Sequence, residues 1–438
     1  MDSAKHNGKR PFITEWVNLT GEEMLIPIVG KAYKLVIKDS EGTVVCEKTV
    51  TAETPEAGYR FMPPKEGNYL IEAGPEGVES ICMMSDEEED ENAEGYFLAS
   101  VHQFGDVKWT TMSKAFVGCS AMEFKETIDT PDLSDVLDAS WMFAGCRAFN
   151  SPLDGWDVSQ ITNMVGMFAG CESFNQPLST WDVSKVRDMS HLFDGCENFD
   201  QPLGAWQVSS VFDMSYMFNS CRAFDQPLET WDVSRVDDMR YMFADCRAFD
   251  QPLNRWDVSK VQVMRGMFIN SNVFNQPLDA WNVGNVVDMS GMFCNCLLFN
   301  QPLDTWNVRQ VKDMSGMFCC CKEFNQPLAS WDVRCVVNMN AMFFGCQRFD
   351  QPLDTWNVSQ VEEMEGMFAH CPSFRHSLDR WHEQAGVDLK ALFQIRAIED
   401  VEDIDTASTL LLQNLNVTAL RDLLGELEDD DDWEDDDE

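Results

Sequence analysis

The sequence has few histidines and lacks the short motifs of common catalytic and cofactor sites. Only six histidines occur in 438 residues, and none of them falls in a catalytic triad or a metal-binding motif. No glycine-rich loop of the kind that holds phosphate is present. We therefore expect no enzyme activity, no cofactor and no metal site.

The chain also lacks long apolar segments. It contains no run of 18 apolar residues, which excludes a transmembrane helix. The N-terminus, MDSAKHNGKRPFITEW, has no apolar core of a signal peptide. The sixteen cysteines show no Cys-x-x-Cys spacing. Free thiols in a chain without these export signals fit a reducing intracellular compartment.

Cations are scarce as well. The chain has 32 Lys and Arg against 75 Asp and Glu, a formal net charge of −43. Such a charge repels nucleic acid and anionic membranes, so we expect no nucleic-acid partner and no membrane insertion. Basic or cationic protein partners are favoured, although simple solubility also explains an acidic surface.

A strict repeat is the strongest positive feature of the sequence. Ten tryptophans follow one another at a constant spacing of 25 residues. They are Trp156, Trp181, Trp206, Trp231, Trp256, Trp281, Trp306, Trp331, Trp356 and Trp381. A period of this length is typical of stacked repeats, each of which buries its apolar face only against its neighbours.

Two apolar patterns meet within each repeat. Leu178, Trp181 and Val183 form an L-x-x-W-x-V pattern that favours a short strand. The apolar residues from Val186 to Cys196 fall at helical offsets. We therefore expect a leucine-rich-repeat-like solenoid with a parallel β-sheet and short helical turns. A three-sided β-solenoid is the alternative.

The repeat string F-N-Q-P-L-x-x-W-D-V-S-x-V-x-x-M-x-x-M-F-x-x-C resembles the repeat of BspA-like bacterial surface proteins, distant relatives of leucine-rich repeats. The resemblance covers about residues 116–393. It implies a repeat surface used for contact or adhesion, often in proteins displayed on cells. It implies no catalytic residues.

Four regions are expected along the chain. Residues 1–100 contain strand-like runs and predict a small β-sandwich, immunoglobulin-like in outline. Residues 101–396 form the repeat array with its degenerate last unit. Residues 397–427 read as a helical cap, or as a helix offered to a partner. Residues 428–438 form a disordered acidic tail, either solubilising or a ligand for a basic protein.

A polar column directly after the tryptophans is the candidate binding face. It has three explanations: hydrogen bonds along the stack or to local backbone amides, the floor of a partner-binding face, or Ca²⁺ binding by paired carboxylates. Two late arginines, three residues after their tryptophans, add a basic spot. The candidate residues are Asp157, Asp182, Asp232, Asp257, Asn282, Asn307, Asp332, Asn357, Arg309 and Arg334.

These features predict a non-catalytic protein-interaction or adhesion scaffold that uses multivalent contacts along one face. A purely structural spacer or assembly component is the first alternative. A metal-dependent enzyme is the second, and it has little support in the sequence.

Overall fold

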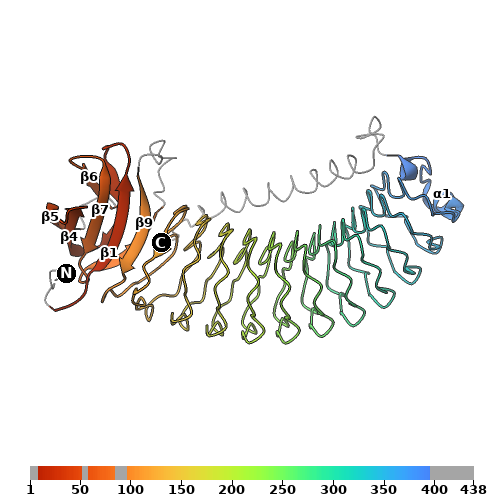
Figure 1. Cartoon of the computed structure of the whole chain (residues 1–438). Helices are drawn as coiled ribbons and strands as arrows, with labels where there is room; N and C mark the ends of the chain where they lie inside the picture. Colours follow the sequence, from red (N-terminus) through yellow and green to blue (C-terminus); the bar gives the residue numbers. More distant parts are fainter. Residues whose placement is uncertain (1–7, 52–57, 84–95, 395–438) are drawn as a thin grey trace, which may run out of the picture.

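The computed structural model describes residues 8–51, 58–83 and 96–394. Its N-terminal part is a six-stranded sheet with the order β10-β9-β1-β7-β4-β5, drawn in red and orange in Figure 1. The strands are β1 (Phe12–Asn18), β4 (Ala32–Asp39), β5 (Val44–Thr51), β7 (Gly67–Ala73), β9 (Tyr96–Gln103) and β10 (Glu123–Phe124).

Two short two-stranded sheets accompany the large one. They pair β2 (Met24–Ile26) with β6 (Tyr59–Phe61), and β3 (Ile28–Gly30) with β8 (Val78–Ile81). Strands β4, β5 and β7 lie within residues 1–100, where the sequence predicts strand-like runs. The expected immunoglobulin-like sandwich is nevertheless wrong as stated, because most strands join one mixed sheet whose edge strand β10 pairs in parallel with β9.

The sheet and the repeats share one apolar core. Phe104, just after β9, packs edge-on against Trp156 with ring centroids 5.4 Å apart. Arg10 pairs with Asp106 at 2.8 Å and with Asp129 at 2.9 Å. The N–H of Phe104 donates to Oδ1 of Asp129 at 2.7 Å. These contacts attach the first repeats to the sheet.

The repeats themselves contain turns and single-residue bridges in place of strands and helices. One parallel bridge links each repeat to the next, from Asp138 and Asn163 through to Asn338 and Glu363. Alternate amides beyond the bridge donate to the following repeat. Met189, His191, Phe193 and Gly195 donate to carbonyls 24 residues further on, at 2.8 to 3.1 Å.

The predicted leucine-rich-repeat-like solenoid is therefore wrong, and so is its three-sided alternative. In the expected strand, the N–H of Trp181 donates to Leu178 and that of Val186 to Val183. Amides closed into tight turns are not available for a sheet ladder. Among residues 107–378 the structure has bridges but no parallel sheet beyond β10.

The expected helix fails for a related reason. Between Met189 and Cys196 the bonds within a repeat join residues three apart, and the amides between them bond to the next repeat. His191 has φ 55° and Gly195 has φ 72°, which are left-handed values that interrupt a right-handed helix. The single α-helix among the described residues is α1 (Asp379–Ala385), followed by the 3₁₀ turn η1 (Ala391–Phe393).

The predicted core positions are confirmed. In the repeat around Trp181 the apolar side chains from Leu178 to Phe199 point inward and are almost fully buried. From Trp181 to Trp381 each repeat tryptophan donates its Nε1–H to a leucine carbonyl of the preceding repeat, as Trp181 does to Leu153 at 3.0 Å. Each column cysteine donates its thiol similarly, as Cys171 does to Phe143 at 3.0 Å. These side chains tie neighbouring repeats together.

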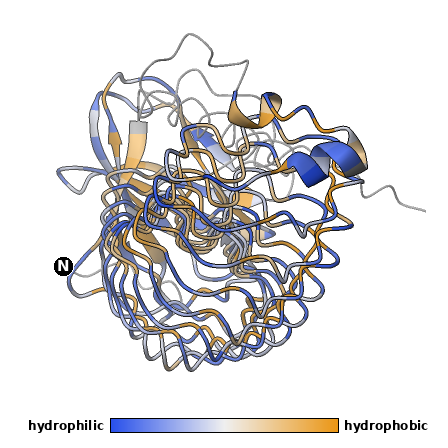
Figure 2. Cartoon of the chain, turned by 90° about the vertical axis from the view of Figure 1, so that its right-hand side faces the viewer, coloured by the Kyte–Doolittle hydropathy of each residue, from blue (hydrophilic) through white to orange (hydrophobic). Residues whose placement is uncertain are grey.

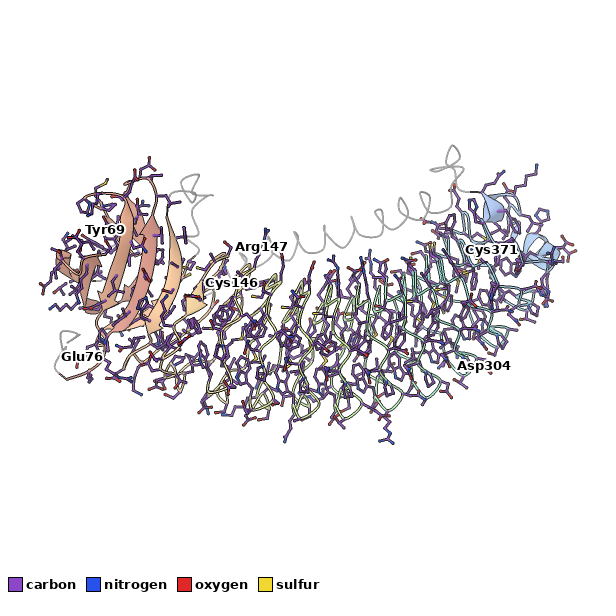
Figure 3. The ribbon with its side chains drawn as sticks, in the orientation of Figure 1. Tyr69, Glu76, Cys146, Arg147, Asp304 and Cys371 are labelled. Carbon is purple, nitrogen blue, oxygen red and sulfur yellow. The ribbon has the colours of Figure 1, made fainter. Side chains whose placement is uncertain are left out.

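The array bends because its two sides have different spacings. Tryptophan rings of adjacent repeats are 6.4 Å apart, as for Trp231 and Trp256, and phenylalanine rings are 5.6 Å apart, as for Phe218 and Phe243. Hydrogen-bonded bridges hold backbones about 4.8 Å apart. The tryptophan side is therefore the wider, outer side of the arc in Figure 1. Figure 3 agrees, since Asp304 near Trp306 lies on the outer edge and Cys146 on the inner one.

Seen from the end of the array that carries α1, successive repeats overlay as nested turns, in which hydrophobic and hydrophilic segments alternate (Figure 2). In the last unit Trp381 lies within α1, yet it stacks on Trp356 at 6.3 Å and stays buried. The described part of the chain contains no helix long and apolar enough to cross a membrane. The predicted helical cap (397–427) and the predicted acidic tail (428–438) lie outside the described residues.

Candidate interaction surface

The eight Asp and Asn residues that follow the tryptophans all close the same local turn. In each repeat the side-chain Oδ1 accepts the N–H of the residue two positions later, at 3.0 Å for Asp182 and 3.3 Å for Asn307. The other six are Asp157, Asp232, Asp257, Asn282, Asp332 and Asn357. The interpretation of this column as local backbone capping is confirmed.

The capping leaves charged oxygens on the surface. All eight side chains are exposed except Asp332, which is half-buried. Hydrogen bonds from the side chain and the backbone N–H of Ser184 hold the pKa of Asp182 below its usual range. The same contacts from Ser234 lower the pKa of Asp232. The column therefore carries fixed negative charges at five of its positions, Asp157, Asp182, Asp232, Asp257 and Asp332, and its role in binding stays a prediction.

The two candidate arginines differ. Arg334 folds back onto Asp332, donating from Nε at 2.8 Å and from Nη2 at 2.7 Å. Arg309 is exposed and its guanidinium makes no ion pair within the described ranges. The described part of the structure shows no metal-binding group that would support the calcium explanation. Within residues 8–51, 58–83 and 96–394, no three or more His, Cys, Asp or Glu side chains are arranged to hold a metal ion.

A second acidic column was missed in the sequence. Asp188, Asp213 and Asp238 occupy the bridge position in three consecutive repeats. Burial raises the pKa of Asp213 to about 6, against the hydrogen bonds from Ser215, and the two neighbouring carboxylates raise it further. The recurring Asp-Met dipeptide was the available signal. This dipeptide lies within the segment that was expected to be helical, so its aspartates were not recognised as a column.

A second apolar cluster lies outside the main core. It is built from side chains on the left-handed turns that follow the bridge. Its members are Tyr216, Tyr241, Ala244, Ile269, Cys294, Cys319, Cys320, Ala341, Phe344 and Ala369. The rings of His191 and Tyr216 stack at 4.4 Å, and those of Tyr216 and Tyr241 at 4.9 Å. The residue type at these positions changes from repeat to repeat, so the 25-residue periodicity of the sequence did not indicate an apolar cluster.

The cysteines are mostly packing residues. None of the sixteen forms a disulfide, and only Cys335 is exposed. Burial raises the pKa of the Cys146 thiol to about 12, and Cys371 is raised to about 12 for the same reason. Such thiols are poor nucleophiles because the thiolate is the reactive form.

One cluster on the sheet resembles a catalytic arrangement in composition. His102 Nε2 lies 3.1 Å from both Ser100 Oγ and Glu15 Oε2. A triad needs the two ring nitrogens to face opposite partners, whereas here one nitrogen faces both. Ser100 is also buried. Partial burial alone would raise the pKa of Glu15, but hydrogen bonds from Asn68, His102 and Ser100 lower it.

The fold and surface together define a tandem-repeat protein whose 25-residue units are built from turns. Residues 110–226, 201–306 and 288–404 each match the family described as "Mycoplasma protein of unknown function, DUF285". The three matches run from residue 110 to residue 404, more than half of the chain, and the chain belongs to this family. No curated protein matches the sequence.

Proposed function

We propose that this chain is a non-catalytic protein-interaction or adhesion scaffold that binds through exposed columns of its repeat array. One observation carries the proposal. Matching capped turns hold Asp or Asn side chains in eight of the nine repeats from Asp157 to Asn357, and all of these side chains except Asp332 are exposed. A rigid periodic surface lets many weak contacts act together on one partner. The resemblance to BspA-like surface proteins supports an adhesive role.

The partner that suits the Asp column is a protein with a basic surface. The pKa values of Asp157, Asp182, Asp232 and Asp332 are lowered by hydrogen bonds, so these carboxylates stay charged well below neutral pH. Ionised carboxylates attract lysine and arginine and repel phosphate. The proposal therefore includes no nucleic acid and no membrane insertion.

The non-catalytic part of the proposal has its own support. The histidine cluster at His102 uses one ring nitrogen for both neighbours. The column thiols, such as Cys146, have raised pKa values. Neither arrangement matches an activated nucleophile.

The test is capture of partners from the native source by the full chain and by two triple variants. The first variant is Asp182→Asn, Asp232→Asn and Asp257→Asn. It removes three charges but keeps the caps, because Asn307 and Asn357 cap the same turn.

The control variant makes the same charge change two residues before the tryptophans, with Asp154→Asn, Asp304→Asn and Asp354→Asn, all of which are exposed. We expect wild type and control to recover the same basic protein and the first variant to lose it. Recovery of no reproducible partner by any of the three would overturn the interaction function and favour a structural spacer. Equal recovery of the partner by all three proteins would show that the Asp column does not take part in binding.

A further inference from the structure

A basic and apolar stripe runs along this acidic protein. We define the basic–apolar stripe as the positions four and six residues after each tryptophan from Trp181 to Trp331. Its members are Lys185, Arg187, Ser210, Phe212, Arg235, Asp237, Lys260, Gln262, Asn285, Val287, Gln310, Lys312, Cys335 and Val337. The stripe holds five cations and one acid, the reverse of the chain's overall balance of 32 to 75.

The cations of the stripe make no direct ion pairs with other described residues. None of its five forms an ion pair within the described ranges, and Lys185 donates only to the neutral Oε1 of Gln160, at 2.7 Å. Several arginines elsewhere on the repeats are paired, as Arg222 is with Glu197 and Asp245. Exposed unpaired cations next to many carboxylates are available to an outside anionic group.

The stripe also exposes apolar side chains. Phe212 is 42% exposed, and Val287 and Val337 are each 37% exposed. Leu137, at the equivalent position two repeats before Arg187, is 58% exposed. These four account for a large share of the exposed large apolar residues of the repeats, and they lie in one column. Apolar residues that align with unpaired cations are typical of an interaction surface.

The stripe is hollowed and rigid. An open hollow of about 330 Å³ is lined by Arg235, Asp237, Lys260, Gln262 and Asn285, all of which belong to the stripe. The backbone beneath is fixed from repeat to repeat, since the N–H of Phe212 donates to Arg187 and that of Asp237 to Phe212, both at 2.9 Å. A preformed surface reduces the ordering cost of binding.

We infer that the stripe binds an extended acidic peptide segment of a partner protein, with apolar side chains among its acidic ones. At the stripe the backbones of neighbouring repeats are hydrogen-bonded, as Phe212 is to Arg187, and hydrogen-bonded neighbouring backbones lie about 4.8 Å apart. The seven repeats of the stripe therefore span about 29 Å, which is the length of roughly nine residues of an extended peptide.

The net charge of −43 does not prevent this binding. At physiological salt the Debye length is about 8 Å, so distant carboxylates are screened and the local cations dominate. Nucleic acid fits less well, because Phe212 is the one aromatic member of the stripe and aliphatic side chains such as Val287 offer no stacking surface for bases. This inference rests on the proposed interaction function and assigns one partner class to one part of the surface.

The test is fluorescence anisotropy of a fluorescein-labelled nine-residue peptide of alternating Glu and Val, titrated with the full chain. The stripe variant is Arg235→Ala with Lys260→Ala. The matched control is Arg147→Ala with Lys322→Ala, which removes the same charge, and Figure 3 places Arg147 on the inner edge of the array. A second variant, Phe212→Ser with Val287→Ser, keeps the charges and removes apolar contacts.

We expect the stripe variant to weaken the affinity at least ten-fold and the control to change it less than two-fold. The apolar variant should weaken it several-fold, and added salt should weaken wild type more than the stripe variant. Absence of peptide binding at 50 mM salt overturns the inference, as does equal loss in both cation variants. Tighter stripe-dependent binding of a single-stranded oligonucleotide of equal charge overturns the assignment to a peptide.

The two proposals fail separately. A partner captured by the wild-type chain that binds the Arg235→Ala, Lys260→Ala variant equally well leaves the interaction function in place and removes the stripe from it.

Discussion

The substitution Asp213→Asn should stabilise the protein. Asp213 lies between Asp188 and Asp238 in the bridge column, and burial raises its pKa to about 6. Because this folded-state pKa lies above the unfolded value of about 3.9, folding disfavours the ionised form. The penalty is small near pH 4, grows as the pH rises between the two pKa values, and is nearly complete by about pH 7.

The structure sets the size of the effect. A shift of about two pKa units corresponds to about 3 kcal/mol, which is an upper bound because the side chain keeps some solvent contact. Asparagine can replace the acceptor, since Asn163 and Asn338 occupy the same column and accept the equivalent amides at 3.0 Å. At pH 7.5 we expect the free energy of unfolding to rise by about 2 kcal/mol.

The assay is denaturant unfolding of the full chain between pH 4 and pH 8. The matched control is Asp232→Asn, in which the same turn bond from Ser234 is present at 3.1 Å but the pKa is lowered. That carboxylate stabilises the fold above its unfolded pKa, so its replacement should bring no gain at pH 7.5. The reasoning is refuted if Asp213→Asn is no more stable than wild type at pH 7.5, or if its gain persists unchanged at pH 4.

Three further outcomes follow from the packing of the repeats. Trp256→Ala should lower the unfolding free energy by about 4 kcal/mol in denaturant titrations, and a loss below about 1 kcal/mol would contradict its place in the core. Gly266→Ala should lower the melting temperature more than Gly291→Ala, although both have φ near +60°. A Cβ at Gly266 would lie 2.3 Å from the ring of Tyr241, whereas Gly291 has its nearest atom at 4.0 Å. Iodoacetamide should alkylate Cys335 first in the native protein, and peptide mapping that finds buried column thiols modified as fast would contradict their burial.

The sequence predicted the core well and the backbone poorly. Leu178, Trp181 and Val183 are buried as expected, because apolar periodicity reports which side chains leave water. The same periodicity did not distinguish a helix from turns. Apolar residues three apart, such as Met189 and Leu192, suit a helix, but they also suit turns closed between residues three apart, which the structure has.

The candidate surface was also predicted in part. The Asp and Asn column was found because Asp182 and its counterparts recur, and its capping role followed from the residue types. The basic–apolar stripe was missed because no single residue type recurs in it: Arg187, Phe212 and Asp237 succeed one another in one column. Only the stacking of repeats places Arg235 beside Lys260 around a common hollow.

The sequence alone determined the 25-residue period, the buried columns and the scarcity of cations, since each depends on residue type and spacing. The tertiary structure decided where the backbone hydrogen bonds go. The backbone amide of Met189, for example, donates to a carbonyl of the next repeat, 24 residues further on. Local propensity depends only on nearby residues, so it cannot predict such a bond. Because these hydrogen bonds join neighbouring repeats, the chain forms stacked turns in place of helices and a sheet. The stack curves with its tryptophan side on the outside. It also aligns cations that make no ion pairs within the described residues along the surface of an acidic protein.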